Sequence, residues 1–379
     1  MRKMIIILAI ILLNTVSISV FALSAHSAIV IDSTSGRILF SHNANARAGM
    51  ASTTKIMTAI TALENSDLSS VVTASPSACS VEGSSMYLVN DEKLTLEEIL
   101  YGLMLVSGND AATAIAEHVS GSTEKFAELM NQKALEIGAF NSHFTNPHGL
   151  SDDMHYTTAH DLAKITAYGL KNPKFAEIVS TKKKSIPWKD HDYNRSLVNH
   201  NKFLSMYDGC IGVKTGFTKA TGRCLVTAVD KNNMRFICVT LNASDDWNDH
   251  RDLYNMSFGN YSPYKVKQKN DMVATADVKK GVEKTVSLVC AEDIYIPVKE
   301  GEDRNIEISA EPFEDLQAPI SQGDVLGKLK IRIGGEDCGE FPLCAAESVD
   351  LKKIIFNSVK GDWSTTLRKV FYFWFTSLI

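Results

Sequence analysis

The feature that most constrains the fold of this chain is a change of sequence pattern near Tyr261. Before it, several stretches place apolar residues at helical spacing; after it, short segments alternate apolar and polar residues, as in "KTVSLVC", "DIYIPV", "NIEISAE" and "LGKLKIRI". With 379 residues the chain is long enough for two domains. We therefore predict one domain over residues 26–261 and a small all-β domain over residues 262–355.

The first of these domains mixes strands with helices. "SAIVIDSTSGRILFSHNANA" predicts two strands around a turn at Ser33–Gly36, and "RCLVTAVDKNNMRFICVTL" predicts two more around Asp230–Asn233. Helical patterns follow Ser52 and then occupy residues 94–116, with an interruption at "SGND", and residues 123–138, 158–170 and 247–260. This mixture predicts an α+β fold.

The first 25 residues have the pattern of a secretory signal peptide. Arg2 and Lys3 precede an apolar run, Met4 to Leu13, and small and apolar residues continue to Ala25. Cleavage after residue 22 and cleavage after residue 24 both fit, and an uncleaved membrane anchor is the alternative. All of these readings place the body of the protein outside the cytoplasm.

The last stretch, residues 361–379, carries a second membrane signal. Large apolar side chains recur there at helical spacing, and aromatic residues crowd the end as "FYFWF". The apolar run from Val370 to Ile379 is far shorter than the ~20 residues that a spanning helix needs. With Arg368 and Lys369 beside it, we predict an amphipathic helix on the outer face of the cytoplasmic membrane. The alternative is a helix that docks on the protein itself.

The net charge and the histidine and cysteine residues exclude some classes of function. A net charge of −5 gives no basic footprint for nucleic acid. The ten histidines form no Cys/His or HExxH pattern, so we expect neither a metal nor a cofactor. Seven cysteines in an exported chain permit disulfides, yet most have apolar neighbours typical of buried thiols. Cys338 and Cys344 fit either a disulfide or two free thiols.

A first candidate for chemistry is Ser52, which Lys55 follows three residues later in "ASTTKIMTAI". A serine hydroxyl needs a base to become a nucleophile, and residues three apart on a helix share a face. The same spacing recurs at Ser122, Ser180 and Ser262, each with a lysine three residues on. Spacing alone therefore does not separate a nucleophile from an ordinary helix start.

Two more short motifs stand at breaks in the pattern. "SGN", which begins at Ser107, separates two apolar helical runs, where a polar break is costly unless it faces a cavity. "KTG", which begins at Lys214, lies within "YDGCIGVKTGFTKATGRCLV". Taken singly, the first is also typical of a simple helix break and the second of a lysine at a strand edge.

In the order Ser-x-x-Lys, Ser-x-Asn, Lys-Thr-Gly, the three motifs are far more specific. With "EGSSMYLVNDEKLTLEEILYGLMLVSGNDAATAIAEHVSGS" and "NSHFTNPHGLSDDMHYTTAHDLA", the chain resembles the low-molecular-mass penicillin-binding proteins that are serine D-alanyl-D-alanine carboxypeptidases. The resemblance implies a β-lactamase/transpeptidase-like catalytic domain with an antiparallel sheet, helices on both faces and a helical subdomain. It also implies the β-rich domain and the C-terminal amphipathic helix.

The resemblance also implies roles for the motif residues. Ser52 would be the nucleophile, Lys55 its base, and Ser107 a proton relay to the leaving amine. Burial and a second ammonium, at Lys214, would both lower the pKa of Lys55 and so favour its neutral form. Asn109 would orient Lys55 and the substrate amide.

Substrate binding follows the same correspondence. Lys214 and Thr215 would hold the terminal carboxylate of a stem peptide that ends in D-Ala-D-Ala, and Gly216 would leave room for the peptide beside the strand. The backbone N–H groups of Ser52 and Phe217 would form the oxyanion hole. The same site would be acylated and inhibited by β-lactam antibiotics.

One departure from the family pattern concerns the arginine that often follows the "KTG" strand and binds the terminal carboxylate. Arg251 is the only arginine in "NASDDWNDHRDLYNMSF", and its alignment with that position is open. A secreted β-lactamase is the nearest alternative, but no Glu between Asn109 and Lys214 has the Asn four residues on that rapid deacylation requires in class A enzymes. A catalytically silent penicillin-binding sensor or scaffold is the other alternative, although all three motifs are intact.

Overall fold

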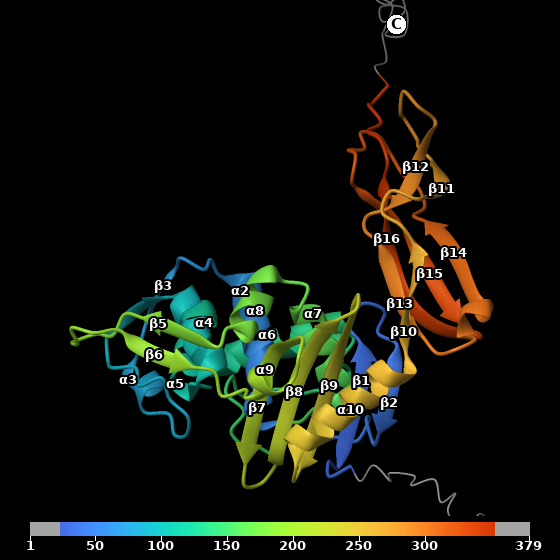
Figure 1. Ribbon diagram of the computed structural model, residues 1–379. Coiled ribbons are helices and arrows are strands. Elements are labelled where there is room, and N and C mark those ends of the chain that lie inside the picture. Colours follow the sequence, from blue (N-terminus) through green and yellow to red (C-terminus); the bar gives the residue numbers. More distant parts are fainter. Residues whose placement is uncertain (1–22, 353–379) are drawn as a thin grey trace, which may run out of the picture. The chain divides into compact units, whose positions relative to one another are not determined.

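A computed structural model describes residues 23–352 of this chain (Figure 1). Residues 1–22 of the predicted signal peptide (1–25) and the predicted amphipathic helix at 361–379 lie outside the described residues. The chain divides into two compact units. Of the described residues, the second unit comprises Gln268–Glu292, Ala310–Leu329 and 342–352, and the first comprises the others. The predicted domain boundary at residue 261 stays a prediction.

An antiparallel five-stranded sheet forms the centre of the first unit, in the order β2-β1-β9-β8-β7. Its strands are β1 (Ser27–Asp32), β2 (Ile38–His42), β7 (Cys210–Thr218), β8 (Gly222–Lys231) and β9 (Met234–Ala243). Both predicted hairpins, β1–β2 and β8–β9, are confirmed. The strand that carries the "KTG" residues, β7, lies at the edge of this sheet.

Helices cover both faces of this sheet (Figure 1). Helix α10 (Asp246–Asn260) packs on one face, where Leu253 and Tyr254 join a buried cluster with Phe236. The other face is covered by α2 (Lys55–Asn65), α7 (Ala159–Gly169) and α8 (Pro173–Ser180). The predicted α+β fold, with helices on both faces of an antiparallel sheet, is confirmed.

A helical subdomain lies beside the sheet and is built from α4 (Leu96–Leu105), α5 (Asn109–Ser120) and α6 (Thr123–Ile137). Thr95 and Glu98 form a capping box at the start of α4. The helix stops at Leu105 and α5 begins at Asn109, so the predicted break at "SGND" is confirmed. Smaller elements complete this part: α3 (Pro76–Cys79), α9 (Phe203–Met206), and the pairs β3–β4 (Val71–Thr73, Lys93–Thr95) and β5–β6 (Lys183–Ile186, Arg195–Val198).

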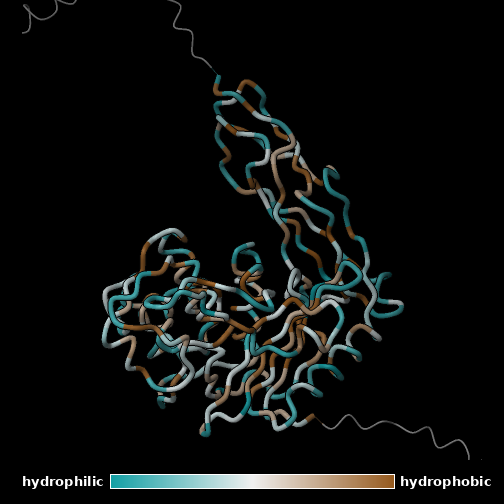
Figure 2. The backbone as a smooth tube through the Cα atoms, turned by 60° about the vertical axis from the view of Figure 1, so that its left-hand side comes forward, coloured by the Kyte–Doolittle hydropathy of each residue, from teal (hydrophilic) through white to brown (hydrophobic). Residues whose placement is uncertain are grey.

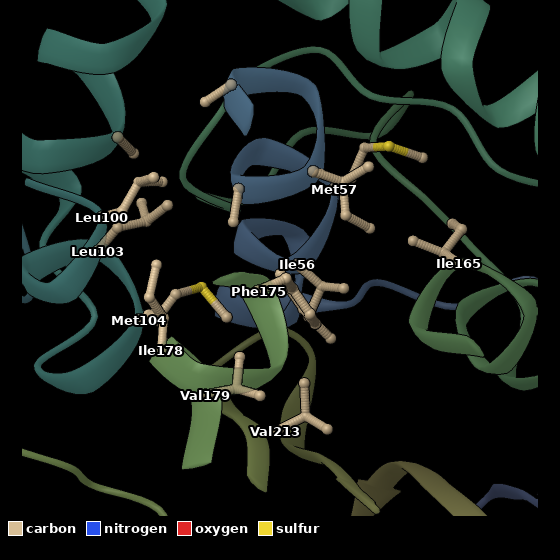
Figure 3. Close-up of a cluster of buried hydrophobic side chains, with 14 of the residues drawn as sticks. Ile56, Met57, Leu100, Leu103, Met104, Ile165, Phe175, Ile178, Val179 and Val213 are labelled. Atoms are coloured by element: carbon tan, nitrogen blue, oxygen red, sulfur yellow. The ribbon is translucent and has the colours of Figure 1, made fainter. Parts of the chain in front are cut away.

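Helix α2 is largely buried. Eight of its residues, Lys55 to Ala62, are buried. In Figure 3, labelled side chains of α4, α7, α8 and β7 surround its Ile56 and Met57. A close-packed surround of this kind fixes the position and rotation of a helix, so it also fixes the residues at its start.

The C-terminal part is all-β, as predicted. Strands β11 (Met272–Asp277), β12 (Thr285–Cys290), β14 (Ile306–Pro312), β15 (Val325–Ile333) and β16 (Glu336–Ala345) form one sheet, and β10 (Ser262–Lys267) pairs with β13 (Ile294–Val298). Hydropathy alternates over short intervals along the chain here (Figure 2), and β15 alternates buried with more exposed residues over most of its length. Within residues 23–352, no helix is long and apolar enough to cross a bilayer.

The structure decides the question of Cys338 and Cys344. Both are buried thiols, and no disulfide joins them. They lie six residues apart on the same strand, β16, which separates them by about 20 Å at the rise of an extended chain. A disulfide needs Cα atoms within about 7 Å, so a regular strand excludes this pairing.

Candidate active site

The candidate site begins where the chain enters α2. Residues Ala51–Thr54 form a 3-10 turn, and α2 itself starts at Lys55. Ala51 has a left-handed φ of 47°, which is uncommon for a residue with a side chain. Ser52 therefore lies on the tight turn and not within the α-helix, but the geometry still brings Lys55 Nζ to 3.1 Å from Ser52 Oγ.

The amine of Lys55 is fully buried and has two further partners. Nζ donates to Asn109 Oδ1 and to the backbone carbonyl of His148, both at 2.7 Å. Burial lowers the pKa of Lys55 well below its usual value; the nearby Lys214 lowers it further, while Asp110 opposes the shift. This environment favours the neutral amine.

The "SGN" residues close one side of the site. Ser107 has a left-handed φ of 62°, and its buried hydroxyl makes no hydrogen bond with the described part of the chain. Asn109 Nδ2 donates to the carbonyl of Glu82 at 2.6 Å, which fixes the amide orientation and turns Oδ1 toward Lys55. Asp110 ties the same loop down by accepting from the Met86 and Leu88 N–H groups.

Strand β7 closes the other side. Lys214 is buried and donates to the carbonyl of Thr215 at 2.8 Å, and burial lowers its pKa to about 7. A Cβ on Gly216 would lie 3.1 Å from the backbone nitrogens of both Ser52 and Thr53, a tight contact that would need a shift of the strand or the turn. Phe217, next along β7, is 64% exposed.

The predicted site residues thus come together to different degrees. Ser52, Lys55 and Asn109 are joined by direct contacts. Gly216 packs against the Ser52 backbone, and Lys214 acts on Lys55 through its charge. Ser107 and Phe217 lie next to this cluster, because each is close in sequence to one of its members, Asn109 or Gly216. Neither the Ser107 side chain nor the Phe217 N–H makes a hydrogen bond to Ser52 or Lys55.

Sequence reasoning missed Arg223, which lies on β8 directly opposite Phe217. Its Nε donates to Asp246 at 2.9 Å, and 44% of its side chain is exposed. Pairing "KTGFT" with "GRCLV" as a hairpin would have given this register from the sequence. Arg251, the alternative considered above, is exposed on α10 and pairs with its neighbour Asp252.

A hollow of about 610 Å³ borders the turn that carries Ser52. Its lining includes Arg47, Ala51, Gly149, His155 and Thr221. The hollow therefore lies between the chain before Ser52, the loop at 149–156 and the turn after β7. Among residues 23–352, His, Cys, Asp and Glu side chains form no group of three or more that could hold a metal ion.

Comparisons with known proteins agree with this geometry. Residues 14–245 match the family described as D-alanyl-D-alanine carboxypeptidase, and residues 261–351 match the penicillin-binding protein 5, C-terminal domain. The chain is 36% identical to D-alanyl-D-alanine carboxypeptidase DacF of Bacillus subtilis, over 91% of this chain and 92% of that one. It is 29% identical to DacA of Haemophilus influenzae, over 83% and 82%.

Solved structures show the same likeness. Penicillin-binding protein 5 from Haemophilus influenzae aligns with a TM-score of 0.67 and 28% identity, over 87% of this chain and 98% of that one. PBP3 from Streptococcus pneumoniae aligns with a TM-score of 0.70 and 26% identity, over 87% and 100%.

This chain belongs to the D-alanyl-D-alanine carboxypeptidase family of low-molecular-mass penicillin-binding proteins. It is a serine-type peptidase with DD-carboxypeptidase activity in cell-wall peptidoglycan metabolism.

Proposed function

We propose that Ser52 is the nucleophile that removes the terminal D-alanine from a peptidoglycan stem peptide. Ser52 Oγ bonds to the carbonyl carbon of the penultimate D-alanine as its proton passes to Lys55 Nζ. The peptide bond then breaks, and the departing D-alanine takes a proton at its amine. Water hydrolyses the resulting ester on Ser52 and restores the enzyme. The observation that carries this proposal is the enclosed amine of Lys55, 3.1 Å from Ser52 Oγ.

The partners of Lys55 suit the role of base. A neutral amine has two hydrogens and one lone pair. Two carbonyl-type oxygens, on Asn109 and His148, lie at donor distance and can take both hydrogens. The lone pair then remains for the hydroxyl hydrogen of Ser52. In an ammonium the third hydrogen would occupy this direction, so the protonated form cannot act as base.

Ser107 would return the proton to the leaving amine. Its hydroxyl is buried without a protein partner among the described residues, which is costly unless a ligand supplies one. The left-handed backbone of Ser107 also costs about 1–3 kcal/mol. Strain of this kind is found mainly at functional sites, where a side chain must be held in one position. Asn109 would orient Lys55 through Oδ1 and face the acyl amide of the substrate.

The terminal carboxylate of the substrate would lie between Lys214, Thr215 and Arg223. Residues directly opposite in an antiparallel pair share a face, and Thr215 pairs with Leu225 while Phe217 pairs with Arg223. Thr215 and Arg223 are therefore diagonal neighbours on one face. Asp246 holds Arg223 through Nε, and the two terminal nitrogens engage no hydrogen bond with residues 23–352. A bound carboxylate would also raise the pKa of Lys214 and favour its ammonium form.

The backbone supplies the remaining contacts. Because β7 is an edge strand, its outer N–H and C=O groups are open to pairing with an extended peptide. Gly216 allows this strand to approach the turn closely, so that the N–H groups of Ser52 and Phe217 would be able to point at one oxygen. Two such donors would form the oxyanion hole, with one donor contributing about 3–4 kcal/mol of transition-state stabilisation.

The decisive experiment measures D-alanine released from a pentapeptide that ends in D-Ala-D-Ala by the purified protein. We expect steady turnover, and a stable penicilloyl ester that mass spectrometry locates on the peptide containing Ser52. Rapid hydrolysis of penicillin without D-alanine release would favour the β-lactamase alternative. A stable ester without any turnover of the peptide would favour the sensor or scaffold.

The assignment of Arg223 has its own test. We expect Arg223→Ala to lower kcat/KM for the pentapeptide about tenfold or more, because a charge-assisted hydrogen bond is worth about 1.5–3 kcal/mol. A substrate amidated at its C-terminus should lose less activity in the variant, since it lacks the charge. Arg251→Ala is the matched control and should leave both rates unchanged. Equal losses for both substrates would contradict a contact between Arg223 and the carboxylate.

We also propose that the protein is exported by its N-terminal segment and attached to the outer face of the cytoplasmic membrane by residues 361–379. Aromatic residues and the charges of Arg368 and Lys369 support an interfacial helix. Deleting residues 363–379 should release the processed protein into the soluble fraction and leave turnover of a short peptide unchanged. High salt should weaken attachment of the intact protein only partly, because salt screens charges and leaves apolar burial. If the truncated, processed protein still sediments with membranes, the anchor lies elsewhere.

A further inference from the structure

A loop from a distant part of the chain presses on the turn that carries Ser52. Its Gly149 has a left-handed φ of 89°, and a Cβ there would lie 1.9 Å from the carbonyl oxygen of Ala51. The Thr58 hydroxyl donates to the carbonyl of Pro147 at 2.6 Å, one residue before the His148 carbonyl that binds Lys55. The loop therefore fixes the peptide before Ser52 as well as the base.

A buried chain of hydrogen bonds joins the same loop to the turn. The Thr145 N–H donates to His155 Nδ1 at 3.1 Å, so this nitrogen carries no proton. Burial lowers the pKa of His155 to about 4, so the ring is neutral at pH 7 and its proton is on Nε2. Nε2 lies 2.7 Å from Thr54 Oγ1, and the Thr54 hydroxyl donates to the Ala51 carbonyl at 2.8 Å. Each donor in this chain thus has one defined acceptor.

The end of this chain is the peptide group between Ala51 and Ser52. Its oxygen receives the hydrogen bond from Thr54, and its N–H belongs to Ser52. A hydrogen bond to the oxygen of a peptide polarises its N–H and strengthens it as a donor. The same bond holds Ala51 in its left-handed conformation, which by itself is unfavourable. The direction and the strength of the Ser52 N–H therefore both depend on Thr54.

We propose that His155 is a positioning residue, which acts through Thr54 to orient and polarise the Ser52 N–H of the oxyanion hole. The proposal rests on the function proposed above and adds a residue that, within residues 23–352, makes no hydrogen bond to Ser52 or Lys55. His155 is 5% exposed, borders the hollow beside Ala51, packs edge-on against Phe144, and has its hydrogen bonds with Thr54 and Thr145. Its effect on chemistry passes through one peptide group.

The test uses three variants and one control in the full-length protein. His155→Gln keeps an acceptor and a donor on one side chain, His155→Leu removes both, and Thr54→Val removes the hydroxyl at similar size. His143→Leu is the control, because His143 binds the carbonyl of Met154 in the same loop but makes no hydrogen bond to Thr54 within residues 23–352. Thermal unfolding of each variant reports whether the fold is retained.

The first readout is the rate of acylation by penicillin. We expect His155→Leu and Thr54→Val to lower this rate about tenfold, less than the 10²–10³-fold loss that follows removal of a whole oxyanion donor. His155→Gln should recover most of the rate, and His143→Leu should match the wild type. The fall should appear in kcat for the pentapeptide with little change in KM, since the hole acts on the transition state.

The second readout is the infrared stretch of the penicilloyl ester carbonyl, which rises in wavenumber as hydrogen bonding in the hole weakens. We expect a rise in His155→Leu and Thr54→Val, and the wild-type position in His155→Gln and His143→Leu. Folded His155→Leu and Thr54→Val proteins with the wild-type band and rate would overturn the role of His155. A wild-type protein that forms no ester on Ser52 would instead overturn the proposed function.

Discussion

The starts of α2 and α6 carry the same serine–lysine spacing and use it in opposite ways. At α6, Ser122 is the N-cap: its hydroxyl accepts from the backbone N–H of Lys125 at 3.3 Å, and the lysine side chain is exposed. At α2, Ser52 lies on a 3-10 turn and caps nothing, while the Lys55 side chain turns inward to the serine.

The difference between these helix starts comes from what surrounds them. Solvent reaches the side chain of Lys125, so its charge costs little. Lys55 is enclosed by α5, the loop at His148 and β7, all distant in sequence, and this enclosure favours its neutral form. The short motif therefore allows the serine and lysine side chains to come close together. The surrounding fold determines whether the lysine is neutral and can act as a base.

The largest expected effect separates the two serines. Ser52→Ala should abolish both penicillin labelling and D-alanine release, because no other hydroxyl of residues 23–352 forms a hydrogen bond with Lys55 Nζ. Ser122→Ala should retain both activities. Mass spectrometry of the digested, labelled protein checks this directly. A penicilloyl group on the peptide containing Ser122 would contradict the prediction that only Ser52 is the nucleophile.

The second effect separates the two lysines. Lys55→Arg should lower acylation by at least a thousandfold, since a guanidinium does not give up its proton near neutral pH. Lys125→Arg should leave the acylation rate unchanged. Wild-type acylation should also fall on acidification, because the lowered pKa of Lys55 makes the neutral base available near neutral pH and acid converts it to the ammonium. A rate that is flat from about pH 6 to 10, with chemistry limiting, would contradict the base.

The third effect is on stability and concerns Lys214. Its pKa is lowered to about 7 by burial, so between pH 7 and the ordinary lysine value the unfolded chain binds more protons than the folded one. Its contribution to stability therefore rises with pH over that range and is least favourable below pH 7. We expect Lys214→Met to raise the Tm by several degrees at pH 6, with a gap that shrinks toward pH 10. Differential scanning calorimetry of wild type and variant between pH 6 and pH 10 measures this gap, and a gap that does not change with pH would contradict the prediction.

The smallest expected effect is on the free energy of unfolding and compares the two serines as helix caps. Ser122→Ala should lower the free energy of unfolding by about 1 kcal/mol, because the start of α6 loses its cap. Ser52→Ala should cost less, since Ser52 makes no capping hydrogen bond. Urea unfolding at matched pH measures both. A larger loss for Ser52→Ala would mean that its hydroxyl also serves the fold.

What the sequence predicted well was local. The hairpins at Ser33–Gly36 and Asp230–Asn233 and the helix break at "SGND" follow from patterns within a few residues, and all three are present. The 3-10 turn at Ser52 was not predicted, because a tight turn and the first turn of an α-helix have the same apolar spacing. Helix α8 and the β5–β6 pair were also missed, since both are short.

At the site, too, some residues could be predicted from the sequence and others required the tertiary structure. The motif residues could be named from their order in the chain, but the His148 carbonyl could not, because a backbone acceptor has no sequence signature. Arg223 was within reach of a hairpin argument, whereas the link from His155 to Thr54 joins residues 101 positions apart and needs the tertiary structure. The disulfide considered between Cys338 and Cys344 failed on strand geometry alone.

The place of β7 at the end of its sheet has a consequence for how the protein behaves in concentrated solution. A free strand edge invites pairing with the edges of other molecules, and proteins commonly discourage this with proline, bulges or charges that point inward. Proline or a bulge beside Gly216 would also repel a bound peptide. The buried amine of Lys214 is an inward-pointing ionisable group on this same strand. Its replacement by an apolar residue should therefore increase self-association even as it raises the melting temperature.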